Sequence, residues 1–303
     1  MTSIAVVILT HNEAHHIERA IASVKPLAQE VFVIDSGSTD GTVELAERAG
    51  AKVLYNKWTN YAVQFQWGLD NAPITAEWTM RLDADEVIEP DLATNLQAAL
   101  PGLAPDITGV KFHRKHIFMG RFIKHGGRYP LTLLRLWRRG AARIENRWMD
   151  EHIILTHGRS VIVEGGFSDI NLGQLDFFTD KHNKYATREA IDVLGQRYGL
   201  FAADRAVADT EEGQVRRKRL LKEQVYNRLP FGTGPVLYFL YRYFIQLGFL
   251  DGTEGAIYHG LQGLWYRFLV DGRILELDRE IRPLASNDDR LRRLTELTGH
   301  KFS

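Results

Sequence analysis

Residues 4–9 read IAVVIL and residues 31–34 read VFVI, and each of these apolar runs is followed by a polar segment and then by a helical pattern. Similar runs lie at residues 52–55 and 78–82, and helical patterns at residues 14–24, 42–49 and 61–71 separate the four runs. Uninterrupted apolar strands joined by single helices are typical of a parallel sheet with helices on both faces. The beginning of the chain therefore predicts an α/β fold with a mostly parallel sheet.

After residue 106 the pattern changes. Strand-like runs lie at residues 110–116 and 133–138, and a strand-like stretch covers residues 143–149. Helical patterns follow at residues 174–198, 213–227, 236–247 and 254–271, before a charged tail at residues 279–303. We therefore expect three parts, which are residues 1–106, residues 107–172 and a helical unit of residues 173–303.

The composition excludes several classes of protein. Basic and acidic residues balance at 38 each, which gives no indication of a nucleic-acid partner. The absence of cysteine excludes disulfides, cysteine-ligated zinc and a cysteine nucleophile. No apolar run reaches the roughly 18 residues of a membrane span, and residues 1–9 lack the basic segment of a signal peptide. We expect a protein of the cytosol that is soluble or peripheral to a membrane.

Three polar clusters follow the first, second and fourth predicted strands. They are residues 10–13 (THNE), residues 35–42 (DSGSTDGT) and residues 83–86 (DADE). In open parallel sheets, ligands bind beyond the carboxyl ends of the strands. We therefore expect the three clusters to meet at one edge of the sheet and to form a binding site.

The third cluster offers two carboxylates, Asp83 and Asp85, at a strand end. Hard cations such as Mg²⁺ and Mn²⁺ are held by one or two carboxylates together with phosphate oxygens. Alternate residues of a regular strand point to opposite faces, so the strand has to end or bend here for both residues to contribute. We expect Asp85 to contact the metal and Asp83 to contact a ribose or the metal's waters. A solvated acidic turn explains the pair equally well.

Two further carboxylates are candidates for binding a nucleotide. Asp40 can accept a hydrogen bond from a uracil N–H or a ribose hydroxyl, and Glu13 can do the same. Each also has a structural explanation, since Asp40 can cap the following helix and an acid such as Glu13 is favoured near a helix start.

These clusters resemble the N-terminal motifs of the second glycosyltransferase family, in residues 8–13 (ILTHNE), 33–42 (VIDSGSTDGT) and 82–86 (LDADE). The resemblance implies a GT-A fold, which is Rossmann-like, and inversion at the anomeric carbon. It also implies a nucleotide-sugar donor held by residues of these motifs and the neighbouring basic stretch. The residues that we assign to the donor are Thr10, Asn12, Glu13, Asp40, Asp83, Arg128 and Arg135.

Later motifs are similar to the subgroup that acts in lipopolysaccharide core assembly. They are residues 126–130 (GGRYP), 134–140 (LRLWRRG), 150–152 (DEH), 179–185 (TDKHNKY) and 248–252 (GFLDG). On this resemblance residues 1–106 form the nucleotide-sugar half and residues 107–172 the acceptor half of one GT-A domain.

Inversion requires a base that deprotonates the acceptor hydroxyl. Glu151 matches the family's base position, and the neighbouring carboxylate of Asp150 would raise one pKa of the pair towards neutrality. The subgroup usually has histidine where this chain has Asp150, so no role of a histidine carries over. A surface acidic pair is the alternative explanation.

Arginine suits bidentate contacts to phosphate, which is why Arg128 and Arg135 are assigned to the donor; a solvated strand face is the alternative. In the last third of the chain, the basic residues Arg216, Arg217, Lys218, Arg219 and Lys222 precede an aromatic helix at residues 236–247. The following residues Ile257, Leu261, Leu264, Trp265 and Phe268 predict one buried helical face. Basic clusters beside apolar helices bind anionic membrane surfaces, although a solvated helix and a core helix explain the same residues.

The acidic pair and the resemblance together indicate a metal-dependent hexosyltransferase that uses Mg²⁺ or Mn²⁺, and the resemblance implies that it inverts the anomeric carbon. The resemblance alone implies UDP-glucose as the donor and, as the acceptor, a hydroxyl of a lipid-linked saccharide such as lipopolysaccharide core. With the basic and apolar helices, we expect the protein at the inner face of the cytoplasmic membrane. Another cell-surface polysaccharide precursor is an alternative acceptor. A nucleotidyltransferase would need a Gly-rich phosphate loop and a lysine after the first strand, and a non-catalytic binding scaffold would not need Asp83, Asp85 and Glu151.

Overall fold

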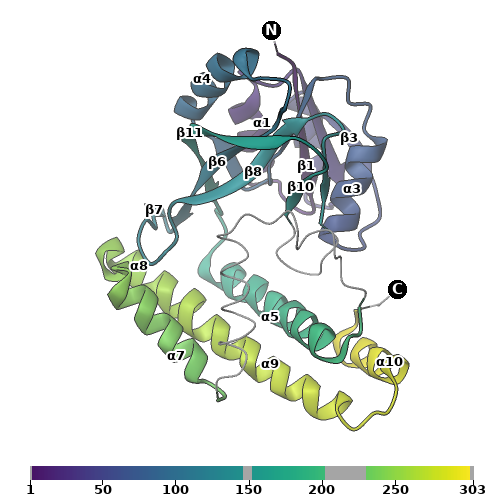
Figure 1. Ribbon diagram of the computed structural model, residues 1–303, viewed down its shortest axis with the longest axis vertical. Coiled ribbons are helices and arrows are strands. Elements are labelled where there is room, and N and C mark those ends of the chain that lie inside the picture. The colour runs from purple at the N-terminus through teal and green to yellow at the C-terminus, as the bar shows by residue number, and fades with distance from the viewer. Residues whose placement is uncertain (1, 146–151, 202–229, 301–303) are drawn as a thin grey trace. The chain divides into compact units, whose positions relative to one another are not determined.

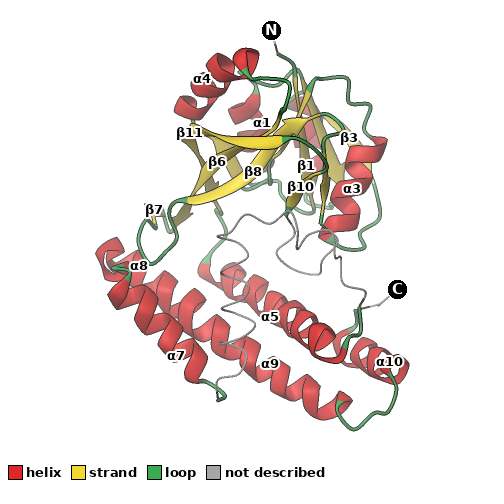
Figure 2. Cartoon of the chain, in the orientation of Figure 1, coloured by secondary structure: helices red, strands yellow, loops and turns green. Residues whose placement is uncertain are grey.

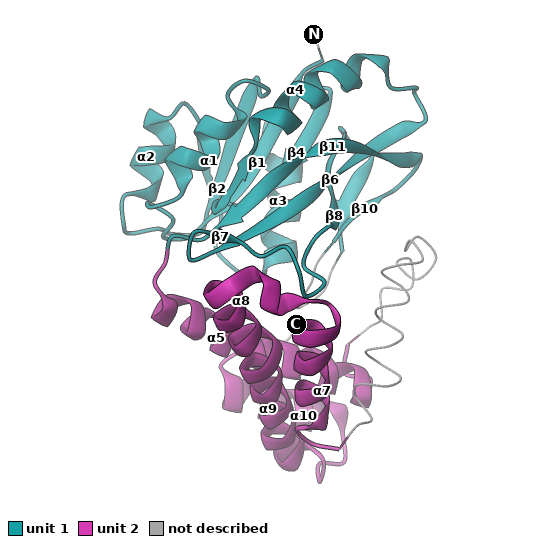
Figure 3. Cartoon of the chain, turned by 90° about the vertical axis from the view of Figure 1, so that its left-hand side faces the viewer, with its two compact units in different colours: residues 1–172 teal, residues 173–303 magenta. Residues whose placement is uncertain are grey.

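A computed structural model describes residues 2–145, 152–201 and 230–300. The chain divides into two compact units, Met1–Leu172 and Gly173–Ser303, which Figure 3 shows in different colours. The first unit contains the sheet and the second is helical among its described residues.

The first unit is built on a mixed sheet in the order β3-β2-β1-β4-β8-β6-β11-β5, with β7 paired to β6 (Figure 1). β1 (Ile4–Thr10), β2 (Glu30–Asp35), β3 (Lys52–Tyr55) and β4 (Trp78–Arg81) are mutually parallel, as predicted. β8 (Leu131–Arg138) runs antiparallel to both β4 and β6 (Ile107–Phe118). β11 (Arg159–Ile170) pairs parallel with β6 and antiparallel with β5 (Glu86–Ile88).

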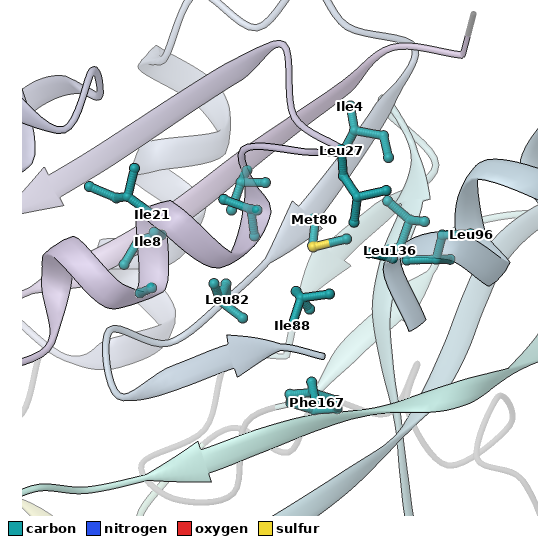
Figure 4. Packing of buried hydrophobic residues seen from close by; sticks show 14 of the residues in the cluster. Ile4, Ile8, Ile21, Leu27, Met80, Leu82, Ile88, Leu96, Leu136 and Phe167 are labelled. Carbon is teal, nitrogen blue, oxygen red and sulfur yellow. The ribbon is translucent and has the colours of Figure 1, made fainter. Parts of the chain in front are cut away.

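Helices cover both faces of the parallel half (Figure 2), which explains why β1 and the middle of β2 are apolar on both faces. On one face, alternate residues of β1 pack with α1 (Ile17–Val24) and α4 (Pro90–Ala99); Figure 4 shows part of this cluster. On the other face, Val7 and Ile34 pack with Phe65 of α3 (Tyr61–Asn71) and with Trp137. α2 (Thr42–Arg48) follows β2, and its Ala46 belongs to the first cluster.

Several elements were not predicted: α4, β5, β7 (Arg121–Phe122), β10 (Ile153–Leu155) and the whole of β11. The strand-like stretch predicted at residues 143–149 overlaps β9 (Ala142–Ile144), and most of the rest of that stretch lies outside the described residues. β11 pairs with β6 through a register shift between Ile162 and Gly166. Gly165 in this shift has a φ of +112° and lies directly against the backbone of Leu92 in α4. A strand with this irregular pairing lacks the simple alternation that would reveal it in the sequence.

The described part of the second unit contains α5 (Leu175–Tyr198), α7 (Thr233–Leu240), α8 (Gly252–Tyr258), α9 (Tyr266–Ile281) and α10 (Asn287–Thr298). The π-helical segments η4 (Tyr241–Ile245) and η6 (His259–Trp265) extend α7 and join α8 to α9, and the 3₁₀ turn η5 (Gly248–Asp251) lies between them. α5 and α9 pack through a cluster that includes Ala190, Leu194 and Leu277. The predicted helix at residues 213–227 lies outside the described residues.

The buried face expected from Ile257, Leu261, Leu264, Trp265 and Phe268 is wrong. Tyr258, His259, Gly263, Tyr266 and Val270 are buried instead, whereas Phe268 is 47% exposed. The buried residues also recur at intervals of three and four, so the period was right and the side was wrong. Ile257, Leu261, Leu264 and Trp265 are only partly buried, on another side of the helix, because the sequence pattern does not show which side the rest of this unit covers.

Candidate active site

The loops after β1 and β2 are joined by hydrogen bonds at the carboxyl edge of the sheet. The backbone amide of Asn12 donates to Oγ of Ser38 over 2.8 Å, and the Thr39 amide donates to Oδ1 of Asn12 over 2.9 Å. The Glu13 amide donates to Oγ1 of Thr42 over 2.8 Å. Asn12 has a φ of 57°, an uncommon conformation that asparagine tolerates better than most residues. The two predicted clusters therefore form one structure.

Asp35 and Asp40 accept most of the bonds that hold this structure together. The carboxylate of Asp35 accepts from the Gly37 and Ser38 amides and from the hydroxyls of Ser38 and Thr10. Burial on its own raises the pKa of Asp35, but these bonds outweigh burial and lower it.

Asp40 accepts from the Ala14 amide at 3.0 Å and from the amide and hydroxyl of Thr42. Its pKa is also lowered, because these hydrogen bonds outweigh the opposing effect of burial. Thr10, Asn12 and Asp40 thus shape the loops, and the described contacts of Asp40 lie within the protein.

Glu13 contacts His16, whose Nδ1 is 2.7 Å from Oε2 of Glu13. The Leu172 amide donates to Nε2 of His16 over 3.0 Å, so Nε2 is the acceptor. Nδ1 therefore carries the ring proton and donates a hydrogen bond to Glu13. His16 connects the first loop to the chain just beyond β11.

Asp83 and Asp85 lie where the strand ends in a turn. This is the condition under which both carboxylates could point to the same site. β4 ends at Arg81 and β5 begins at Glu86, and the chain turns at Ala84 and Asp85 between them. Oδ2 of Asp85 accepts from Nδ2 of Asn171 over 3.3 Å, and its carbonyl accepts from the Ile170 amide over 2.9 Å. Arg19 of α1 donates to the Ile170 carbonyl over 2.6 Å, and the Asp85 charge acts on its guanidinium.

Asp83 lies among groups that stabilise its negative charge. Oδ1 accepts from the Tyr61 hydroxyl over 2.5 Å and from Nε of Arg81 over 3.3 Å, and Oδ2 accepts from Nη2 of Arg135 over 3.1 Å. Burial raises the pKa of Asp83, but Arg81 and Arg135 outweigh burial and lower it. The guanidinium of Arg81 also lies 4.4 Å from the ring centre of Tyr61. Asp83 is therefore ionised and fixed in place.

Arg135, assigned to the donor from the sequence, is 4% exposed, and its Nη2 lies 2.7 Å from Oε1 of the buried Glu86. Glu86 also faces Arg114 of β6, at 3.7 Å. Burial raises the pKa of Glu86 and the charge of Asp83 adds to this, against the opposing effect of Arg135.

Arg114 also lies 3.7 Å from Asp169, so the network of charged side chains extends to Asp169 and His116. Oδ2 of Asp169 and Nδ1 of His116 are 3.1 Å apart. Burial lowers the pKa of His116. Tyr61, Arg81, Arg114, His116 and Asp169 were not predicted to belong to this site. Their spacing follows no motif, and only the order of strands in the sheet and the packing of α3 against it bring them together.

The remaining candidates are placed only in part. Arg128 lies in the loop between β7 and β8, where its charge acts on His116. Asp150 and Glu151 lie outside the described residues. The residues on either side of that segment are hydrogen-bonded to each other: the Glu145 amide donates to the His152 carbonyl over 2.8 Å.

A divalent cation is compatible with the acidic turn. In the described part of the chain, no group of three or more His, Asp or Glu side chains is placed to hold a metal ion by itself. A Mg²⁺ or Mn²⁺ ion commonly takes only one or two carboxylates from the protein and its other ligands from phosphate and water. Asp85, and Asp83 through a remaining lone pair, fit that pattern.

The sheet and the polar loops at its carboxyl edge together define a GT-A fold. Residues 5–163 match the family model described as glycosyl transferase family 2, and the chain belongs to that family. It is therefore a glycosyltransferase.

Two relatives that align over most of this chain are also named glycosyltransferases. A protein named "Uncharacterized glycosyltransferase" from Rickettsia bellii (strain RML369-C) is 26% identical over 293 residues, which cover 94% of this chain and 90% of that protein. The lipopolysaccharide core biosynthesis glycosyltransferase LpsC of Rhizobium meliloti (strain 1021) is 26% identical over 274 residues, which cover 89% of this chain and 90% of LpsC. Among solved structures, mannosyl-3-phosphoglycerate synthase from Rubrobacter xylanophilus has a TM-score of 0.43 at 15% identity, covering 70% of this chain and 78% of that one.

Proposed function

We propose that this glycosyltransferase moves a sugar, with inversion, from a nucleotide diphosphate to a hydroxyl of a lipid-linked saccharide, with Mg²⁺ or Mn²⁺ bound at Asp85. The observation that carries the proposal is the acidic turn Asp83–Ala84–Asp85 beside two interlocked loops at the carboxyl edge of the sheet. A cation there would neutralise the charge that grows on the leaving diphosphate.

Within this proposal the chain's own residues have separate tasks. Asn12 and Asp40 keep the loops in shape, and Glu13 and Asp83 are the carboxylates offered to the ribose or base. Arg128 is the candidate for the diphosphate, because an arginine can contact two phosphate oxygens at once. Residues 1–106 hold the donor and residues 107–172 hold the acceptor.

Glu151 is the proposed base that takes the proton of the acceptor hydroxyl. The contact between Glu145 and His152 supports the proposal because it anchors both ends of the segment that contains Asp150 and Glu151. Both anchors adjoin β9 and β10, which pair antiparallel in the first unit.

The acceptor class rests on the likeness to LpsC, whose name refers to lipopolysaccharide core biosynthesis, and UDP-glucose is the proposed donor. The test is a panel of UDP-, GDP- and CMP-sugars, incubated with and without EDTA. Release of the nucleotide from one sugar nucleotide, dependent on the metal, is the expected result. Release of pyrophosphate instead would indicate a nucleotidyltransferase, and no release from any donor would contradict the proposal.

The second unit provides the proposed membrane contact. No helix among residues 2–145, 152–201 and 230–300 is long and apolar enough to cross a bilayer. Large apolar side chains are nonetheless exposed along α7, η4 and η5, including Leu237 at 55%, Phe244 at 53% and Ile245 at 72%. Arg242, by contrast, is buried and donates to Oε1 of Gln262 over 2.5 Å. This surface suits the boundary region of a lipid bilayer.

Firm binding of this kind requires a second, electrostatic signal, for which the basic residues 216–219 and Lys222 are the candidates; they lie outside the described residues. Wild type should pellet with anionic vesicles at low salt and less at high salt. Substituting Phe244 and Ile245 by serine, or Arg216, Arg217 and Arg219 by glutamate, should reduce binding. Met119→Ser, which changes an exposed apolar residue of the first unit, is the control. Equal binding to neutral and anionic vesicles, or none to either, would contradict membrane docking.

A further inference from the structure

Arg135 occupies a β-bulge. In the pairing of β6 with β8, Val110 lies opposite Leu136 but Lys111 lies opposite Leu134, so Arg135 is the extra residue of β8. A bulge interrupts the alternation of side chains and turns the extra residue in a new direction. Here it directs the side chain of Arg135 to the acidic turn after β4, where the Arg135 guanidinium bonds to both Asp83 and Glu86.

Burying this guanidinium costs hydration free energy. Arg135 is 4% exposed, and its Nε and Nη1 have no hydrogen-bond partner among the described residues. The guanidinium lies 5.5 Å from the ring centre of Phe167, within cation–π range, which offsets only part of the lost hydration. Buried ion pairs generally stabilise a fold no better than apolar residues of the same size. A contribution to stability is therefore a weak explanation for placing a charge here.

The pair fixes both the backbone and the side chain of Asp83. Oε2 of Glu86 accepts the backbone amide of Asp83 over 3.0 Å, while Oε1 accepts from Arg135. The same Nη2 of Arg135 donates to the Asp83 carboxylate over 3.1 Å. Arg135 and Glu86 thus hold Asp83 at two points, from two strands that are not neighbours in the sheet.

We propose that Arg135 and Glu86 form a positioning pair that holds the Asp83 carboxylate, and with it the turn to Asp85, in the geometry that receives the donor before the donor binds. This inference rests on the proposed function, in which the donor and its metal meet Asp83 and Asp85. Arg135 itself does not touch the donor, which replaces its assignment as a donor-binding residue.

The test measures UDP binding by calorimetry, with and without Mn²⁺, alongside thermal unfolding. Groups that orient metal-binding carboxylates typically change metal affinity by about 10- to 100-fold when they are removed. Arg135→Lys should therefore weaken metal-dependent UDP binding by about tenfold or more. Arg138→Lys is the matched control, because Arg138 lies on the same strand, pairs with Glu77 and packs over Trp78 at the opposite end of β4. It should bind UDP like wild type.

A double variant separates positioning from stability. Arg135→Met removes the closest charged partner of the buried Glu86, leaves it with Arg114 at 3.7 Å, and should lower the melting temperature. Arg135→Met with Glu86→Leu removes both charges of the pair and should recover much of the loss. UDP affinity should stay low in both variants, since Oδ2 of Asp83 has lost its bond to Arg135 and only Oδ1 is still held, by Tyr61 and Arg81. Affinity that recovers together with stability would overturn the inference, as would wild-type affinity in Arg135→Lys. If wild type itself binds no nucleotide with metal, the proposed function fails and the inference with it.

Discussion

The hydroxyl of Tyr61, at the start of α3, donates a 2.5 Å hydrogen bond to Oδ1 of Asp83, in the turn after β4. This bond connects a helix that covers the sheet to a carboxylate at the sheet's edge. Burial raises the pKa of Tyr61, so the hydroxyl remains a donor at neutral and mildly alkaline pH. Tyr61 and Arg135 hold the two oxygens of Asp83 from different sides.

Tyr61→Phe should weaken metal-dependent UDP binding roughly five- to tenfold, because the charged acceptor loses a hydrogen bond. Calorimetry at pH 7.5 measures the effect. Tyr198→Phe is the matched control, since it removes a 2.7 Å bond to Asp278 in the second unit. It should lower stability and leave UDP affinity unchanged; a similar loss of affinity in both variants would mean that Tyr61 acts only through general stability.

Asp85→Ala should abolish the part of UDP binding that requires Mn²⁺ or Mg²⁺ while the fold persists, because Asp85 lies in a turn outside the core. Asp106→Ala removes a carboxylate just before β6 that pairs with Arg159, and it should retain binding. UDP binding to the Asp85→Ala variant as tight as wild type in the presence of metal would exclude Asp85 as a ligand.

Glu151→Gln should reduce kcat by about 10²–10⁴ and preserve donor affinity, since glutamine keeps the shape of the side chain but cannot take a proton. Single-turnover transfer together with UDP calorimetry distinguishes the two quantities. A larger loss in Asp150→Asn than in Glu151→Gln would move the role of base to Asp150.

The Asp35 carboxylate should make the free energy of unfolding depend on pH in the acidic range. Its pKa is 3.8 in an unfolded chain and lower in the fold, so its contribution is present above pH 3.8 and is lost as the pH falls through the folded value. Urea unfolding at pH 7, 5 and 3 should show Asp35→Asn less stable than wild type at pH 7 and 5, with a smaller difference at pH 3. The exposed Asp70, changed to Asn, should show little difference throughout. A constant deficit for Asp35→Asn would contradict this linkage.

Gly165→Ala should destabilise the first unit by about 3 kcal/mol or more, measured by urea unfolding. A Cβ at this position would lie 2.6 Å from Cα and 2.7 Å from N of Leu92, and backbone atoms cannot move aside as a flexible side chain can. Gly50 has a similar φ of +96° with no atom within 4 Å of a Cβ, so Gly50→Ala should cost only about 1–2 kcal/mol of backbone strain. Equal costs would show that α4 yields to the added methyl.

The first four strands could be predicted from the sequence because their signals are local. Residues 52–55 and 61–71 were predicted with the observed bounds of β3 and α3, and the ends of β1, β2 and β4 differ by one residue. An apolar run buried on both faces and a polar turn at its end need no distant partner to be recognised. The same local motifs located Asp35, Asp40, Asp83 and Asp85 at the edge that they share.

Only the tertiary structure decided which of these residues are held and by what. Arg135 reads as one basic residue among several in residues 134–140. Its burial follows from a bulge between β6 and β8, where the pairs on either side of it, Val110 with Leu136 and Lys111 with Leu134, are 26 and 23 positions apart. The partners Tyr61, Arg114 and Asp169 come from α3, β6 and β11, which the order of the sheet brings to the acidic turn. Pairing over such separations depends on the free energy of the whole sheet. The sequence by itself therefore determined which edge carries the candidate site, and the fold determined how the charges at that edge are arranged.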